Sequence, residues 1–131
     1  MTFMLYSYDI CIPPSTPESS ALWTDCDVSP GTLTRLIVIF PPGAARLAHV
    51  RIFLWSHQLY PSNLDSSLSG DSEVVDVPEN LDLNDRPYRL RIQAWNDDDS
   101  FQHTVCVRFS ILRITSTAGI PRWLQKLLMG V

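Results

Sequence analysis

The chain has 131 residues, a length typical of one domain that buries its own core without disulfide or metal support. Apolar residues make up 45% of it and charged residues 18%, a composition that excludes a disordered chain. The formal net charge of −4 disfavours nucleic-acid binding, because neutralising phosphates requires a basic surface. Residues 64–99 carry ten acids and three arginines, whereas the rest carries four acids and seven bases. This asymmetry either orients subunits in an assembly or reflects acids gathered in solvated loops.

The three cysteines show no CxxC spacing, so a zinc site is not expected. Cys106 lies in an apolar run and is expected to be a small core or half-buried residue. The sequence leaves open whether Cys11 and Cys26 form a disulfide, although nothing in it indicates an oxidising compartment. The N-terminus lacks the features of a signal peptide, and no apolar stretch reaches the roughly 18 residues of a membrane helix. We therefore expect a soluble, unprocessed chain without membrane contacts.

Short apolar runs rich in β-branched and aromatic residues, with ten prolines, predict an all-β fold. The first half of the chain predicts strands over 3–12, 21–28, 33–40 and 46–56, separated by a proline-serine loop at 13–20 and by turns at SPG (29–31) and PPG (41–43). The run LTRLIVIF (33–40) is apolar on both faces, which suits a strand buried between two layers. The inward face of the first strand is expected to hold Met4, Tyr6, Tyr8, Ile10 and Ile12.

The second half predicts a loop over 57–70, a short acidic edge strand over 72–78 and an irregular connection over 78–87. Two alternating strands follow, 87–95 and 101–114, and the second points Val105, Val107, Phe109 and Ile111 inward. Together these elements predict an antiparallel β-sandwich of about seven strands, Ig-like or Greek-key, over 1–114. Residues 1–30 are also compatible with an extended N-terminal arm that orders on binding.

Residues 115–131 are expected to form a polar linker and a short amphipathic helix. The apolar stripe of IPRWLQKLLMGV follows helical spacing and consists of Ile120, Trp123, Leu124, Leu127 and Leu128. A helix of about ten residues is too short to be stable alone in water. It is therefore expected to dock, either on its own sandwich or on a neighbouring subunit.

The stretch AWNDDDSFQHTV (94–105) has three consecutive carboxylates and a histidine. Asn and Asp tolerate turn conformations, so the simplest interpretation is a hairpin tip between the last two long strands. A calcium site using Asn96, Asp97 and Asp99 is the alternative, although the EF-hand spacing is absent. An acid/base site requires paired carboxylates across a cleft, which one tip does not provide. His103 shares the parity of the inward residues and is expected to be a hydrogen-bonded histidine at the sheet end.

No catalytic or nucleotide-binding motif occurs, so the sequence predicts no enzyme, and it predicts no cofactor. The aromatic side chains of Trp55, Tyr60 and Trp95 are candidates for an exposed platform that binds sugars or protein partners. The alternative is that they pack beneath the C-terminal helix. The candidate interaction residues are therefore Trp55, Tyr60, Trp95, Trp123, Leu124, Leu127 and Leu128.

Several segments combine into a familiar pattern: PPG (41–43), HQLYPSN (57–63), GD (70–71) and PYRLRIQAWNDDDSFQHTVCVRF (87–109). Over about residues 30–112 the chain resembles small β-sandwich proteins of tailed bacteriophages. This resemblance implies a virion structural component, such as a capsid decoration (cement) protein or a tail accessory module, assembled in the host cytoplasm. Its partners would be other virion proteins and further copies of the chain. A carbohydrate- or calcium-dependent binding module is the alternative function.

Overall fold

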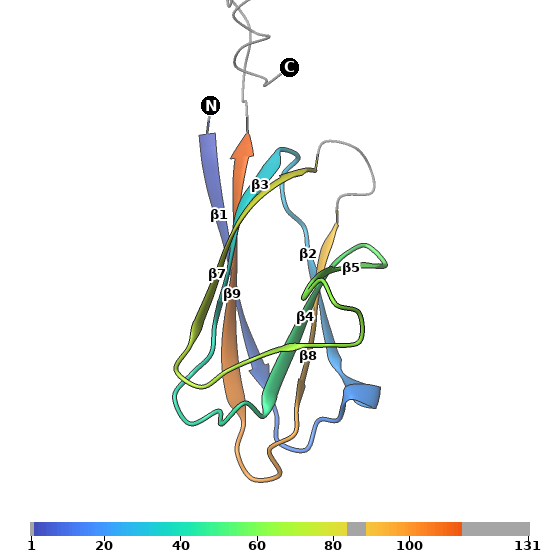
Figure 1. Ribbon diagram of the computed structural model, residues 1–131, viewed down its shortest axis with the longest axis vertical. Coiled ribbons are helices and arrows are strands. Elements are labelled where there is room, and N and C mark those ends of the chain that lie inside the picture. Colours follow the sequence, from blue (N-terminus) through green and yellow to red (C-terminus); the bar gives the residue numbers. More distant parts are fainter. Residues whose placement is uncertain (1, 84–88, 114–131) are drawn as a thin grey trace, which may run out of the picture.

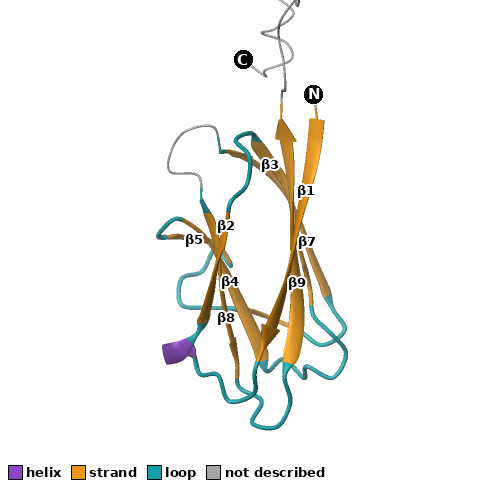
Figure 2. Ribbon diagram, turned by 180° about the vertical axis from the view of Figure 1, so that it is seen from behind, coloured by secondary structure: helices purple, strands orange, loops and turns teal. Residues whose placement is uncertain are grey.

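The computed structural model describes residues 2–83 and 89–113, which form two antiparallel β-sheets packed face to face (Figure 1 and Figure 2). One sheet has the order β1-β9-β3-β7, and the other has the order β2-β8-β4-β5 with β6 paired to β4. The strands are β1 (Thr2–Ile12), β2 (Leu22–Cys26), β3 (Thr32–Ile39), β4 (Ala48–Leu54), β5 (His57–Tyr60), β6 (Leu68–Ser69), β7 (Val74–Asp82), β8 (Leu90–Asn96) and β9 (His103–Arg113). The helical content of the described residues is one 3₁₀ turn, η1 (Glu18–Ser20). The predicted all-β class with two antiparallel sheets is confirmed.

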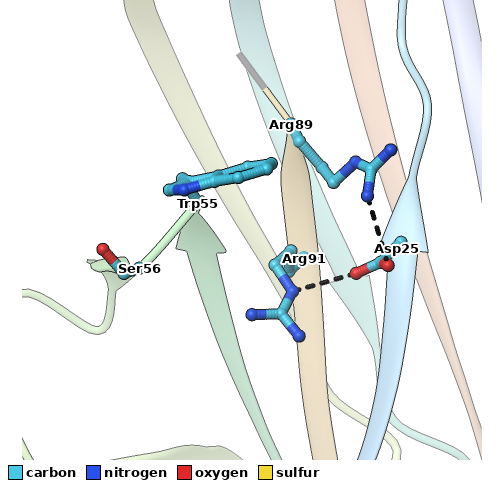
Figure 3. Close-up of a pocket in the computed structure, with 5 residues that line it drawn as sticks. All are labelled: Asp25, Trp55, Ser56, Arg89 and Arg91. Atoms are coloured by element: carbon cyan, nitrogen blue, oxygen red, sulfur yellow. Dashed lines mark hydrogen bonds and ion pairs between the residues drawn. The ribbon is translucent and has the colours of Figure 1, made fainter. Parts of the chain in front are cut away.

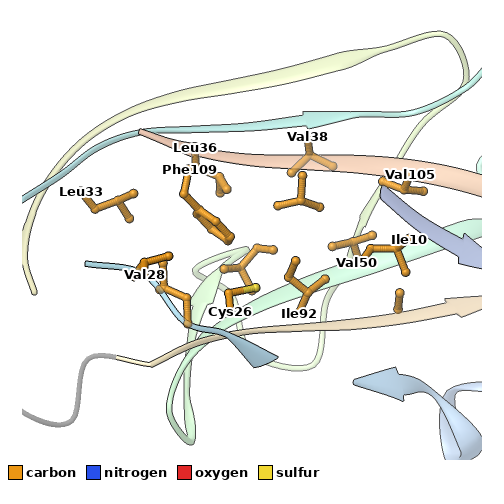
Figure 4. Packing of buried hydrophobic residues seen from close by; sticks show 14 of the residues in the cluster. Ile10, Cys26, Val28, Leu33, Leu36, Val38, Val50, Ile92, Val105 and Phe109 are labelled. Atoms are coloured by element: carbon orange, nitrogen blue, oxygen red, sulfur yellow. The ribbon is translucent and has the colours of Figure 1, made fainter. Parts of the chain in front are cut away.

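The core lies between the two sheets, because alternate residues of each strand point inward. The inward sets predicted for the first strand and for the last one are confirmed, and burial in β1 increases from Met4 towards Ile12. Phe109, Leu36 and Ile92 are fully buried and lie between the two sheets (Figure 4). The hydrophobic effect on this contiguous cluster holds the sheets together.

The strand boundaries differ from expectation in the middle of the chain. Residues 57–70, expected as a loop, contain β5 and β6, and β7 runs on to Asp82 through a segment expected to be irregular. The partner β3 supports β7 over this whole length, with one register shift between Leu33 and Arg35. Strand β3 was expected to be buried between two layers, but the second sheet covers only its inner face. The outward residues Ile37 and Ile39 are therefore half-buried.

The N-terminal segment belongs to the sandwich. Strand β1 pairs with β9 over eleven residue pairs, and β2 pairs with β8. Residues 2–12 and 22–26 therefore have their backbone partners within the chain and do not form an extended arm. All three cysteines are free: Cys11 points outward from β1, while Cys26 lies in the core. No Cys11–Cys26 disulfide forms, because these side chains lie on opposite sides of the first sheet's layer.

The connection between β8 and β9 corrects the predicted hairpin. The two strands are consecutive in the chain, but β8 belongs to the second sheet and β9 to the first. Residues 97–102 therefore cross from one sheet to the other at the end of the sandwich (Figure 1). The predicted C-terminal helix with Trp123, Leu124, Leu127 and Leu128 lies outside the described residues. Within the described ranges, no helix is long and apolar enough to cross a membrane.

Candidate functional site

The outer face of the second sheet carries a row of large side chains, which we call the Trp–Arg face. Its members are Trp23, Asp25, Phe53, Trp55, Arg89 and Arg91. The odd-numbered residues of β2, β4 and β8 share this face because side chains alternate along a strand. The register places Asp25 opposite Arg91 and Arg91 opposite Phe53, so the three strands contribute to one continuous surface.

Arg91 is the centre of the Trp–Arg face. Its guanidinium carbon lies 4.5 Å from the centroid of the Trp23 ring, and its Nε donates to Asp25 Oδ1 at 2.9 Å. The Trp23 ring also packs against Phe53, with ring centroids 5.1 Å apart. Cation–π and ring contacts of this kind fix the orientation of the indole. Trp23 nevertheless remains 46% exposed, so a rigid aromatic surface faces solvent.

Trp55 stands in the two-residue connection between β4 and β5, where Leu54 pairs with His57. Its φ is +56°, in the left-handed region. Asn or Gly normally occupies that position in such a hairpin, and a bulky aromatic residue there is an outlier. Trp55 is 49% exposed, and the guanidinium of Arg89 lies 5.7 Å from its ring centroid. The chain thus holds an indole in solvent at a conformational cost, which is a feature associated with functional sites.

A small pocket opens between Trp55 and the β2–β8 edge (Figure 3). It is lined by Asp25, Trp55, Ser56, Arg89 and Arg91 and has a volume of about 220 Å³. Asp25 accepts from Arg91 Nε at 2.9 Å and lies 3.5 Å from Arg89 Nη1. The volume is below the roughly 300–1,000 Å³ of pockets for drug-sized ligands. It suits one inserted side chain or one sugar ring, with an aromatic wall and charged groups opposite.

Trp95 also lies on the outer face but is not available to a ligand. Its ring stacks on His49 at a centroid distance of 5.1 Å and 12°, and the guanidinium carbon of Arg51 lies 4.7 Å from it. Only 5% of Trp95 is exposed. Arg51 is buried as well and donates to the carbonyl oxygens of Asp65 and Ser66 at 2.7 and 2.8 Å. This stack fastens the loop after β5 onto the sheet.

The loop 97–102 is organised by the buried side chain of Asn96. Its Nδ2 donates to the carbonyl oxygens of Ile12, Pro13 and Phe101 at 3.2, 3.3 and 2.9 Å, and its Oδ1 accepts from the Asp98 backbone N–H at 2.9 Å. Asn96 is fully buried. One amide therefore ties the end of β1 to the loop that joins the two sheets.

Asp98 and His103 form the second part of the same network. Asp98 Oδ1 accepts from the backbone N–H groups of Ser100 and Phe101, and Oδ2 lies 2.8 Å from His103 Nε2. These hydrogen bonds, led by that from Ser100 and then by that from His103, lower the pKa of Asp98 below its usual range. His103 is buried at the end of β9, as its parity predicted. Both side chains hold the loop in place.

A second histidine joins a chain of polar groups. His49 Nδ1 lies 2.8 Å from Ser67 Oγ, and Nε2 lies 2.9 Å from Asp97 Oδ2. A hydroxyl, an imidazole and a carboxylate in this order can relay a proton. In a serine-hydrolase triad the serine contacts Nε2 and the carboxylate contacts Nδ1, whereas here Ser67 lies beside Nδ1 and Asp97 beside Nε2. The third histidine, His57, is exposed on β5 and belongs to neither pair.

The core thiol is not a candidate nucleophile. Burial, the largest effect, raises the pKa of Cys26 to about 12, so it stays protonated at neutral pH. Its Sγ lies 3.8 Å from the carbonyl oxygen of Thr24.

The structure separates the residues that the sequence grouped together. Trp55 is exposed, Trp95 is buried, and the Tyr60 hydroxyl donates to Glu79 of β7, so these three aromatic side chains do not form one platform. Among the tip residues, Asp97 pairs with His49, and Asp99 accepts from the Ser100 hydroxyl. Within the described part of the chain, no group of three or more His, Cys, Asp or Glu side chains could hold a metal ion.

Sequence reasoning did not single out Trp23, Asp25 or Arg91. The alternating pattern did contain this information, because it places Trp23 and Asp25 on one face of β2 and Arg91 on the outer face of β8. What was missing was the pairing of β2 with β8, which brings the two sets together.

No family model matches the chain, and no curated protein matches it.

Proposed function

We propose that this chain is a non-enzymatic structural protein of a phage particle, a capsid decoration protein or another virion accessory protein. It acts through protein–protein contacts made by the Trp–Arg face. We further propose that the sandwich is Ig-like or Greek-key and that residues 115–131 form a linker and a C-terminal amphipathic helix. The resemblance of residues 30–112 to phage sandwich proteins supports the virion role.

The observation that carries the binding role is the exposure of two indoles beside a small pocket. Trp23 and Trp55 are 46% and 49% exposed, and arginines hold both rings. Tryptophan and arginine are enriched among the residues that dominate the affinity of protein interfaces, and these residues cluster around small desolvated pockets. The pocket beside Trp55 is of the size that one partner side chain fills.

The test is the copy number of the chain in purified particles of the phage that encodes it. The wild-type chain is expected at a fixed stoichiometry. The double variant Trp23→Ala/Trp55→Ala should reduce the bound copies by on the order of tenfold, since each indole is placed as an interface anchor. Leu64→Ala is the matched control, because Leu64 is 69% exposed in the loop after β5 and outside the Trp–Arg face. Absence of the chain from particles, or equal copy numbers for all variants, would contradict the proposal.

The non-enzymatic part has its own test, directed at Ser67. A fluorophosphonate probe labels an activated serine covalently and spares an ordinary one. We expect no labelling of Ser67 in the folded chain. Labelling that disappears in His49→Gln would show a working relay and would replace the proposal with a hydrolase.

A carbohydrate-binding module is the second candidate, and the pocket favours it specifically. An exposed indole opposite Asp25 and two arginines offers a flat apolar surface with hydrogen-bonding groups at its border. Wild-type chain would then bind a glycan array, and both Trp55→Ala and Asp25→Asn would abolish the signal. Binding that survives in both variants would exclude this pocket as the sugar site.

A further inference from the structure

Strand β1 forms an edge of the first sheet that differs from the other edges of the sandwich. It has eleven residues, TFMLYSYDICI, without proline, glycine, lysine or arginine, and with Asp9 as its one charge. Its pairing with β9 is unbroken from Thr2 to Ile12, so the backbone is regular along its whole length. Among the described strands β1 pairs with β9 alone. The opposite side of its backbone is therefore a regular row of hydrogen-bonding groups.

The other three edges carry the features that usually prevent pairing between molecules. Strand β7 includes Pro78 and several acids and has a register shift against β3. Strands β2 and β5 have five and four residues. Short length, charge and proline all protect an edge strand from pairing with another chain. Strand β1 is long and has no proline, and its one charge, Asp9, lies outside the first seven residues of the strand.

The N-terminal half of β1 exposes two large apolar side chains. Phe3 and Leu5 are 69% and 63% exposed on the outer face. On the inner face, Met4, Tyr6 and Tyr8 are half-buried, whereas Ile10 and Ile12 are buried within the core. The open part of the edge is therefore residues 2–8, and both of its faces still have apolar surface to bury.

We propose that residues 2–8 of β1 pair antiparallel with the same residues of a second copy, joining two four-stranded sheets into one. This partner fits because its strand is already extended, so pairing orders no new backbone. In a two-fold symmetric dimer the β1 edges of both copies are paired with each other. The edges that remain, β2, β5 and β7, are protected, so the assembly ends at two copies. The proposal does not depend on the virion role or on the Trp–Arg face.

The charge and side-chain pattern selects the register. Centring the two-fold axis on Leu5 places Leu5 opposite its counterpart and Phe3 diagonally beside it, so four exposed apolar side chains meet on the outer face. On the inner face Met4 meets Tyr6 of the other copy. Centring the axis on Asp9 would place two carboxylates directly opposite each other, which is destabilising. The Leu5-centred register keeps both Asp9 side chains outside the paired segment.

Light scattering of the purified full chain gives the first test. The 14.9 kDa chain should be a dimer at about 100 μM, and Leu5→Lys should weaken dimerisation by about tenfold or more because two lysines then face each other. Val74→Lys is the matched control: Val74 is 61% exposed on the other edge strand of the same sheet, and this variant should remain dimeric. A monomeric wild-type chain overturns the proposal, and so does a dimer that Leu5→Lys leaves intact.

Cysteine cross-linking tests the register and guards against misfolding of the lysine variant. Directly opposite residues have Cα atoms about 4.5–5.5 Å apart, within the range that a disulfide spans. In a chain whose exposed and half-buried thiols are removed (Cys11→Ser and Cys106→Ser), Leu5→Cys should therefore give a reductant-sensitive dimer under mild oxidation, whereas Val74→Cys should not. Leu5→Cys that stays uncrosslinked in a dimeric sample overturns the pairing. Protection of the β1 edge from hydrogen exchange in a monomeric wild-type chain would instead indicate coverage by the chain's own C-terminal residues, which also overturns it.

Discussion

The loop 97–102 and the hairpin at Trp55 differ in how they use their side chains. The loop has three consecutive carboxylates, but Asp97 and Asp98 each contact a histidine, and the buried amide of Asn96 makes four hydrogen bonds. The two-residue connection Trp55–Ser56 has no charged residue, yet it holds a half-exposed indole at positive φ. The acids of the loop have hydrogen-bond partners within the molecule, whereas about half of the Trp55 side chain faces solvent. An exposed aromatic side chain held at a conformational cost is therefore a better indicator of a binding site than a cluster of acids.

The largest effect should come from removing the amide that organises the loop. Asn96→Ala leaves three carbonyl oxygens and one N–H near the core without their partner, and should lower the free energy of unfolding by about 2–4 kcal/mol. Urea denaturation measures this loss. Asp99→Ala is the control and should change stability by about 0.5 kcal/mol or less, because Asp99 is exposed. Equal losses for both variants would show that the loop is not organised in this way.

Acid should produce a smaller loss through Asp98, since protonation leaves the side chain in place. The pKa of Asp98 is lowered in the folded state, so the stability it contributes is present above its unfolded pKa of about 4 and is lost as the pH falls through the folded pKa. The urea midpoint should therefore fall between pH 5 and pH 2. Asp98→Asn should flatten this part of the profile, whereas Asp99→Asn should leave it unchanged. A profile that is the same in all three chains would contradict the role of Asp98.

The smallest effect, and the one of opposite sign, is expected at the hairpin. Trp55→Asn places a residue that tolerates positive φ at this turn and should raise the free energy of unfolding by about 0.5–1 kcal/mol. The same variant should lose binding to particles. Trp23→Asn is the control, because Trp23 lies in the regular strand β2 and its replacement should lower stability. A loss of stability in both variants would remove the argument that Trp55 is retained for binding.

The sequence predicted what depends on neighbouring residues in the chain. Alternation identified the inward sets of β1 and β9, and it placed His103 on the core side. Burial of Trp95 could not be predicted, because His49 and Arg51 cover it from a strand more than forty positions away in the chain. The hairpin interpretation failed for the same reason. Local pattern shows that a turn exists, but only the partners of β8 and β9 show that it joins different sheets.

The candidate site was predictable only in part. Trp55 was expected inside a strand over 46–56, whereas β4 ends at Leu54 and Trp55 lies in the turn at positive φ, a property of the backbone that composition does not show. The pocket beside it requires Asp25 from β2 and Arg91 from β8, which are separated by 66 positions. Sites assembled from distant strands become visible only when the register is known.

The antiparallel ladder between β1 and β9 has a mechanical consequence. Thr2 lies opposite Arg113, so the two ends of the described domain leave it side by side (Figure 1). A force that pulls these ends apart would load the ladder at its first pair and open it like a zipper, one pair at a time, instead of shearing eleven pairs together. The domain would therefore unfold at low force when it is stretched between its two ends. It would resist a higher force if it were pulled at opposite ends of the ladder, because the eleven pairs would then shear together.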